Sequence, residues 1–375
     1  MVPFQYGSAV KGVDFCCRSN LLEQLTSHME KGERFALTGE QRIGKTSILY
    51  EALRRAGQRG IVASFLNVKS HDDLCKHLIR RTLAAFQGTR LFDRLLVEAA
   101  SLRPKRGTDP ITGAQIVDFD ANTNLGLEDF EHLIGVIASV CPDHPITIIF
   151  DDLHIYYLTH AKNDIERFRD ILEACSQITF ILSACEHTQK SRIFEGARAI
   201  FRKWGPVHRV EPVSFEDFHP YLLSKFGEAG RHIEEGVLKQ VYDWCGGIPG
   251  NTQRFCEALW AISEPGERIG QEKINAALLL IFEREQKNYE YYLLHDLTAL
   301  QVRVLMAVVT VGGKRTSSAE FLRAAGSVHA SSAKRAIERL IEKNILVATG
   351  SRVKIGDPFF AAYLSYQRAL VCKVA

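Results

Sequence analysis

Residues 35–47, with the sequence FALTGEQRIGKTS, determine more of the fold than any other stretch of the chain. A short apolar run there breaks into polar residues framed by Gly39 and Gly44, and a helical pattern follows. The spacing G-x-x-x-x-G-K-[ST] is met in full and is typical of a phosphate-binding loop, the Walker A motif. The two glycines let successive backbone N–H groups point at phosphate oxygens. The stretch therefore predicts a strand, a phosphate-binding loop and a helix.

Two side chains of this loop carry the expected chemistry. Lys45 supplies a mobile positive charge for the β- and γ-phosphates, and Thr46 supplies a hydroxyl for Mg²⁺. The positive end of the following helix faces the same anion. An ordinary glycine-rich turn is the alternative. We expect ATP or ADP with Mg²⁺ to bind here through Gly39, Gln41, Arg42, Ile43, Gly44, Lys45, Thr46 and Ser47.

A second polar feature follows about one hundred residues later, where the apolar run 145–150 ends in Asp151 and Asp152. A buried parallel strand that ends in acids is what a phosphate-loop fold needs for its metal-side carboxylate. We expect Asp151 to hold the Mg²⁺-bound water and Asp152 to polarise the water that attacks the γ-phosphate. The alternative is that both are simply turn acids at the end of a strand.

A fourth strand is predicted at 178–187, and its end supplies a candidate sensor of the γ-phosphate. Ser183 is the first choice for this role, and Glu186 and His187 are weaker ones. Strands and helices alternate through this half of the chain, which predicts a parallel sheet covered on both faces. Segment 103–122 is rich in Gly, Pro and Thr and reads as a hairpin insertion.

The composition is that of a soluble globular protein, with 46% hydrophobic and 24% charged residues among 375. No apolar run approaches the roughly 18 residues of a membrane span, and no signal sequence begins the chain, so we expect a cytoplasmic protein without a membrane partner. The nine cysteines are odd in number and scattered, without a C-x-x-C pair. They are expected to be reduced thiols rather than disulfides or zinc ligands.

The pattern predicts three domains: a P-loop ATPase core at 1–213, a helical lid at 214–294 and a winged helix-turn-helix at 295–375. Within the lid, the run CGGIPGNTQR at 245–254 ends one helix and starts another, with Asn251 as the expected N-cap. We expect no strand in the roughly eighty residues after Phe215.

The last domain is expected to contain three helices, at 297–307, 317–325 and 331–343, and a hairpin at 345–355. Residues 296–375 carry twelve Lys or Arg against five acids, an excess of +7 that leaves −4 for the remainder. Such a basic module could bind double-stranded DNA, with a helix in the major groove and a wing on phosphates. A solvated face, a protein contact or an autoinhibitory clamp are the alternatives. The candidate DNA contacts are Lys334, Arg335, Arg339, Arg352 and Lys354.

With these motifs in this order, nearly the whole chain resembles the archaeal-type AAA-like ATPases, a branch of the signal-transducing (STAND) NTPases. The opening run FQYGSAVKGVDFCCR at 4–18 fits the phrase F-x-Y/F-G-x-x-V-x-G-x-x-F-x-x-R of that family. The run RIGKTS at 42–47 is similar to its R-x-G-K-T-S loop, and DPFF at 357–360 is similar to its motif after the wing. The resemblance implies that Val10, Phe15 and Arg18 border the adenine and that the turn containing Pro249 brings the lid onto the nucleotide.

Two positions depart from the family pattern. Asp152 stands where relatives usually carry Glu, and a water-positioning carboxylate misplaced by about 1 Å can lower the rate roughly a hundredfold. Ala184 and Cys185 stand where relatives often show Gly-Ser. The leading expectation is a slowly hydrolysing ATPase that acts as a switch and repositions its winged helix. The alternatives are a DNA-binding protein with a structural nucleotide and an ATP-controlled, self-associating scaffold in stress or defence signalling.

Overall fold

The computed structural model describes residues 3–87, 89–108, 115–119, 122–140, 146–185, 193–350 and 352–374. The chain divides into two compact units. The first, which we call the α/β unit, contains Arg18–Gly39 and Lys45–Val210. The second, the helical unit, contains Met1–Cys17, Glu40–Gly44 and Glu211–Ala375. The three domain boundaries drawn from the sequence stay predictions.

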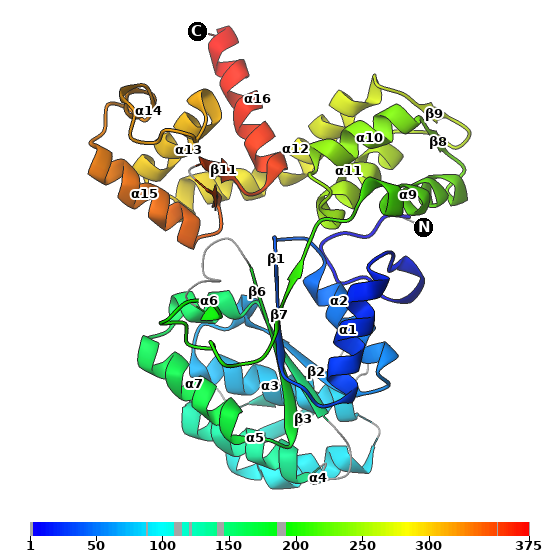
Figure 1. Ribbon diagram of the computed structural model, residues 1–375, viewed down its shortest axis with the longest axis vertical. Coiled ribbons are helices and arrows are strands. Elements are labelled where there is room, and N and C mark those ends of the chain that lie inside the picture. The colour runs from blue at the N-terminus through cyan, green and yellow to red at the C-terminus, as the bar shows by residue number, and fades with distance from the viewer. Residues whose placement is uncertain are drawn as a thin grey trace. The chain divides into compact units, whose positions relative to one another are not determined.

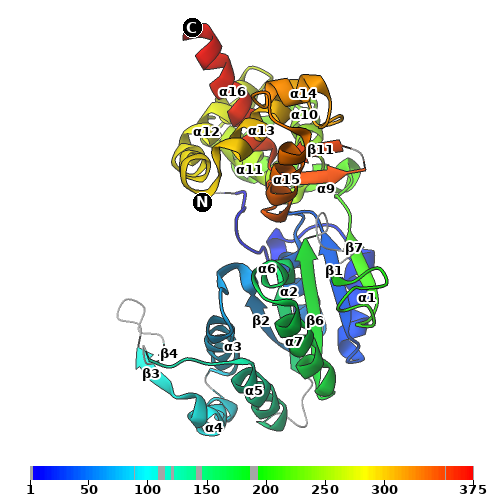
Figure 2. The same ribbon diagram turned by 90° about the vertical axis from the view of Figure 1, so that its left-hand side faces the viewer.

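A five-stranded parallel sheet forms the centre of the α/β unit, in the order β2-β5-β6-β1-β7 (Figures 1 and 2). The residues of β1, β5 and β6 are buried throughout, as expected of parallel strands covered on both faces. Because β6 lies between β1 and β5, the ends of these three strands meet at one edge. The strands are β1 (Phe35–Gly39), β2 (Arg59–Ser64), β5 (Ile146–Asp151), β6 (Ile178–Cys185) and β7 (Val207–Val210).

Helices cover both faces of this sheet, with α1 and α2 on one side and α3, α5 and α7 on the other (Figure 1). The predicted insertion is a hairpin of β3 (Pro104–Thr108) and β4 (Gln115–Phe119), which confirms that expectation. The helices of the unit are α1 (Ser19–Glu30), α2 (Lys45–Arg55), α3 (His71–Phe86), α4 (Arg90–Glu98), α5 (Leu127–Val140), α6 (Leu153–Thr159) and α7 (Lys162–Ala174), with short turns at Phe65–Asn67 and Ala99–Leu102.

The first part of the helical unit contains α9 (Phe215–Glu228), α10 (Glu235–Trp244), α11 (Pro249–Ala261) and α12 (Lys273–Tyr291), followed by a π-helical turn at Tyr292–Asp296. The N-terminal segment packs on α9, where the rings of Phe4 and Phe226 lie 4.7 Å apart. Lys225 forms an ion pair of 2.7 Å with Asp14 of the short turn Gly12–Asp14.

Two expectations for this part were wrong. The segments His232–Ile233 (β8) and Arg268–Ile269 (β9) form a parallel pair, although no strand was expected. Two-residue strands are too short to produce a detectable alternation. Asn251 does not cap α11, because Pro249 occupies the first helical position and Ile248 is the N-cap.

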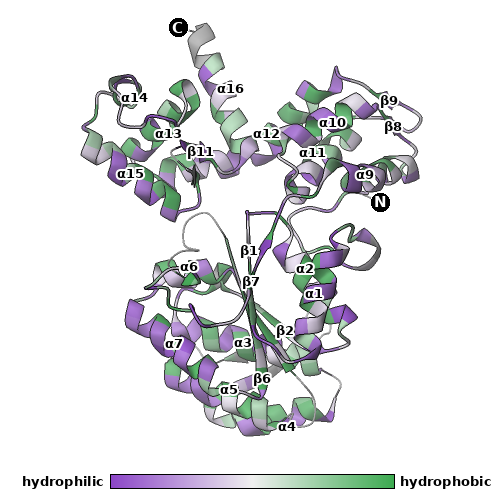
Figure 3. Ribbon diagram, in the orientation of Figure 1, coloured by the Kyte–Doolittle hydropathy of each residue, from purple (hydrophilic) through white to green (hydrophobic). Residues whose placement is uncertain are grey.

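The last part of the unit is the predicted winged helix. It contains α13 (Ala299–Val311), α14 (Ala319–Ala324), α15 (Ala330–Glu342), β10 (Leu346–Thr349), β11 (Arg352–Ile355) and a further helix, α16 (Pro358–Val374). Helix α15 buries Ala333, Ala336, Ile337 and Leu340, and its purple and green turns alternate in Figure 3. The expected fold class, a P-loop α/β core followed by lid helices and a winged helix, is confirmed. None of the helices in the described parts of the chain is long and apolar enough to cross a membrane.

Candidate functional site

The predicted metal-side residues meet at the edge where β1, β5 and β6 end. Thr46, the second residue of α2, donates its hydroxyl to Oδ2 of Asp151, and the two oxygens lie 2.5 Å apart. Asp151 is the last residue of β5 and is only 2% exposed. The separation along the chain is 105 positions, so the sheet order rather than the local sequence creates this contact.

The phosphate loop has the backbone expected of its sequence. Gly44 has a φ of +98°, which favours glycine, and Arg42 adopts a left-handed φ of 61° despite its side chain. Lys45 is 7% exposed, and its ammonium donates to the carbonyl of Gly39 at 3.2 Å. Ile43 and Ser47 are buried, whereas Gln41 is exposed.

Asp152 lies beside Asp151 in a left-handed conformation, with a φ of 59°. Its Oδ2 accepts a hydrogen bond of 3.3 Å from the hydroxyl of Ser64, at the end of β2. Burial, followed by the charge of Asp151, raises the pKa of Asp152 to about 6, while Lys45 and the Ser64 hydroxyl oppose that rise. The carboxylate is therefore held in place by a residue that the sequence did not single out.

His154 is a second residue of this edge that the sequence analysis missed. It is 4% exposed, and its Nδ1 accepts the backbone N–H of Cys185 at 3.2 Å. Burial, followed by the charge of Lys45, lowers the pKa of His154 to about 4, so the ring is neutral near pH 7. Its position three residues after Asp151 was the available signal. The histidine ties the start of α6 to the end of β6.

Ser183 lies on β6 opposite Leu37 of β1, two residues before the end of that strand. It is fully buried, and its hydroxyl has no hydrogen-bond partner among the described residues. Its role as a sensor stays a prediction. The weaker candidates, Glu186 and His187, lie outside the described residues.

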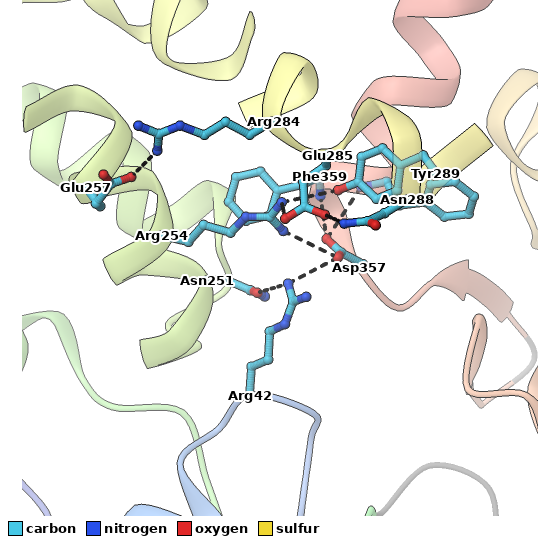
Figure 4. A network of polar contacts seen from close by, with 11 residues as sticks. Arg42, Asn251, Arg254, Glu257, Arg284, Glu285, Asn288, Tyr289, Asp357 and Phe359 are labelled. Atoms are coloured by element: carbon cyan, nitrogen blue, oxygen red, sulfur yellow. Dashed lines mark hydrogen bonds and ion pairs between the residues drawn. The ribbon is translucent and has the colours of Figure 1, made fainter. Parts of the chain in front are cut away.

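In the helical unit, Arg42 binds residues from two distant parts of the sequence (Figure 4). Its guanidinium donates to the side chain of Asn251 at 3.4 Å and forms an ion pair of 3.1 Å with Asp357. Its carbonyl accepts the N–H of Gly250 at 3.1 Å. A Cβ on Gly250 would lie 2.9 Å from that carbonyl oxygen, so the start of α11 can approach Arg42 because this residue is glycine.

Asp357 is shared with a second arginine (Figure 4). Arg254 is 3% exposed and lies 3.7 Å from Asp357 and 2.8 Å from Glu285. Its guanidinium also stacks over the ring of Phe359, 4.5 Å from the centroid. Asp357 in turn accepts the N–H of Phe359 at 2.9 Å and so caps the first turn of α16. The DPFF run thus anchors α16 to both arginines.

The residues expected around the adenine belong to different units. Val10 and Phe15 are half-buried in the helical unit, and Pro249 begins α11 in the same unit. Arg18 belongs to the α/β unit and has a left-handed φ of 70°. The carbonyl of Asp14 accepts the hydroxyl of Tyr221 at 3.1 Å, a contact that holds the N-terminal segment on α9. Contacts to adenine stay predictions.

Among the candidate DNA contacts, two of three on α15 have acidic neighbours. Lys334 lies 4.0 Å from Glu338, and Arg339 forms a 2.8 Å ion pair with Glu342. Arg335 lies on the same helix and is exposed. Arg352 and Lys354 are exposed on β11, where they alternate with Val353 and Ile355.

The Thr46–Asp151 pair fits Mg²⁺ because this ion prefers one or two oxygen ligands from the protein together with water and substrate phosphates. No cluster of three or more His, Cys, Asp or Glu that could hold a metal by itself occurs among the residues that the structure describes. A Mg²⁺ site in which the nucleotide phosphates supply further ligands does not require such a cluster.

Comparison with known proteins supports the architecture. A family model described as "Probable winged helix domain" matches residues 287–366. A Walker-type ATPase of Pyrococcus abyssi has a similar structure, with a TM-score of 0.64 and 16% identity over 97% of this chain and 99% of that one. The ORC1 protein of Aeropyrum pernix, solved in complex with DNA, has a TM-score of 0.55 and 14% identity over 96% of this chain and 95% of that one. No curated protein matches. The resemblance to archaeal AAA-like ATPases with a winged helix is thereby confirmed at the level of fold.

Proposed function

We propose that the chain is an ATP-dependent switch that hydrolyses its nucleotide slowly. The observation that carries the proposal is that Arg42, within the phosphate-binding loop, forms an ion pair with Asp357, which caps the last helix of the winged-helix part. A change in the loop on binding ATP or ADP would alter this pair. The winged helix would respond because Asp357 also binds the buried Arg254.

Nucleotide binding is assigned to the residues that meet at the edge of the sheet. Lys45 would place its charge on the β- and γ-phosphates, and Thr46 with Asp151 would hold Mg²⁺. When bound, that ion would neutralise developing charge on the phosphates. Asp152 would orient a water for in-line attack on the γ-phosphate, held in position by its bond to Ser64. The shorter side chain of aspartate, compared with glutamate, is the reason to expect slow turnover.

The enzymatic part is tested by phosphate release from the wild type and Lys45→Ala at equal concentration. We expect slow release that the substitution abolishes; equal rates would remove the enzymatic part. The switch is tested by hydrogen exchange with ADP and with a slowly hydrolysed ATP analogue. Protection around Asp357 and α16 should differ between the two nucleotides, and identical protection would contradict a switch.

A second candidate function is binding of double-stranded DNA. It is favoured by the winged-helix match and by the exposed basic residues of α15 and β11. Affinity for duplex DNA should fall steeply as the salt concentration rises. Arg335→Ala should reduce the slope of log affinity against log salt concentration by about one, the contribution of one phosphate contact. Absence of binding at about 50 mM salt would exclude it. Mass measurement with each nucleotide would test the scaffold alternative.

A further inference from the structure

A pocket of ≈ 760 Å³ lies within the helical unit, and none of the described residues that line it is among those assigned to the nucleotide. Its walls come from the end of α10, from α12, from the end of α13, and from β11 and α16. Pockets of about 300–1,000 Å³ typically bury a small molecule. The volume alone therefore permits a ligand of that size.

Small residues create the space. Gly312 and Gly313 follow α13, and Ala361 and Ala362 contribute the wall from α16. The N–H of Val353 donates to the carbonyl of Gly313 at 3.0 Å, and a Cβ on Gly313 would lie only 1.9 Å from the Val353 carbonyl oxygen. The close approach of this segment to β11 thus requires glycine.

Large apolar side chains that line the pocket are left in contact with water. Leu279 is 46% exposed, Tyr366 is 38% exposed and Trp244 is 37% exposed. Covering such side chains stabilises a complex by about 25 cal/mol per Å² of apolar surface removed from water. An occupant with an apolar body would gain from this burial.

The charges of the pocket have one sign. Arg352 and Lys354 line it from β11, whereas no Asp or Glu is found among the described lining residues. Neither side chain pairs, by a hydrogen bond or an ion pair, with a described residue that would neutralise its positive charge. A carboxylate or phosphate near both would form charge-assisted hydrogen bonds, which are stronger than neutral ones.

We propose that this pocket binds an amphiphilic anion, a small molecule with an apolar body that ends in a carboxylate or a phosphate. The pocket volume lies within the range of small-molecule sites, which favours the small molecule. An acidic helix from a partner protein would meet the same charges and is the other occupant that the experiment distinguishes.

Calorimetry on the full chain tests this assignment, with dodecanoate, dodecyl phosphate and dodecyltrimethylammonium as probes below their micelle concentrations. We expect one anion to bind per chain, about tenfold more tightly than the cation. Whichever of dodecanoate and dodecyl phosphate binds more tightly identifies the head group. Binding of several probe molecules regardless of head group would overturn the proposal, as would binding of an acidic helical peptide alone.

Two variants locate the site. Arg352→Gln with Lys354→Gln should remove the preference for anions, and Ala362→Phe should block all three probes by filling the space. Arg335→Gln on α15 removes a charge outside the pocket and is the matched control. Circular dichroism checks that each variant folds, and the charge variant keeps the test decisive if Ala362→Phe does not fold. Unchanged anion binding in the charge variant would overturn the assignment.

Discussion

Arg42 and Asp357 are separated by 315 positions in the sequence and form an ion pair of 3.1 Å. The first lies in the phosphate-binding loop and the second caps α16. The pair gives the proposed switch a specific connection that mutations can probe separately from nucleotide chemistry.

We expect Arg42→Ala and Asp357→Asn to be non-additive in stability. The side chain of Arg42 is 41% exposed, so solvent screening should keep the coupling energy at about 0.5–1 kcal/mol. Urea unfolding followed by tryptophan fluorescence measures it, since Trp244 packs 5.0 Å from the ring of Phe359. The surface pair Arg339 and Glu342 supplies a control cycle. If the changes in the free energy of unfolding caused by Arg42→Ala and Asp357→Asn were strictly additive, the pair would contribute no coupling energy to stability.

Thr46→Ala should lower the Mg²⁺-dependent part of nucleotide affinity by about tenfold, because it removes a metal-side hydroxyl. In the presence of a chelator, the nucleotide affinity of Thr46→Ala should differ little from that of the wild type. Thr46→Ser, which keeps the hydroxyl, should behave like the wild type. A fluorescent ATP analogue titrated with and without Mg²⁺ measures both quantities. Thr159→Ala, at the exposed end of α6, is the control. An equal loss with and without Mg²⁺ would argue against the metal assignment.

Asp152→Glu should accelerate phosphate release by up to about a hundredfold, because the longer side chain can reach a water that aspartate places poorly. Asp152→Asn should reduce release to the level of Lys45→Ala. Steady-state phosphate assays at saturating ATP measure both. A rate that Asp152→Glu leaves unchanged would mean that the reach of this carboxylate does not limit turnover.

Glu51→Gln should lower the melting temperature by a few degrees near pH 7. Glu51 is 3% exposed and accepts hydrogen bonds from Arg54 and Arg55, and the bond from Arg54 is the main reason that its pKa falls from 4.5 to about 2. A depressed pKa stabilises the fold above pH 4.5, and the contribution is lost as pH falls toward about 2.

The melting temperatures of wild type and Glu51→Gln should therefore converge as the pH falls from about 4.5 to about 2. Scanning calorimetry across that range measures the convergence. The exposed Glu98→Gln on α4 should show no such trend. A difference that stays constant with pH would mean that packing, rather than charge, explains the effect.

The sequence predicted those parts of the site that depend on local patterns. The glycines around Lys45 and the acids at the end of β5 are recognisable without tertiary information, and the two residues that these motifs assigned to the metal, Thr46 and Asp151, do meet. The winged helix followed from the helical periodicity of residues 297–343 and from the hairpin expected at 345–355.

The contacts of Arg42, His154 and Ser64 could not be predicted, because each joins a side chain to a residue brought near only by the fold. The N-cap was misassigned because Asn251 is a good capping residue, but the rigid φ of Pro249 favours an earlier start of α11. Asn251 is thereby free to bind Arg42.

The helical unit is discontinuous in the chain, since it combines Met1–Cys17 and Glu40–Gly44 with Glu211–Ala375. A fragment that starts at Glu211 would lack Phe4 and Asp14 and would expose the surface of α9 around Phe226 and Lys225. It would also leave Asp357 without Arg42. The C-terminal half, expressed alone or fused to a reporter, would therefore expose apolar surface that the full chain covers. We expect such a fragment to aggregate or bind other proteins non-specifically rather than to fold as an independent domain.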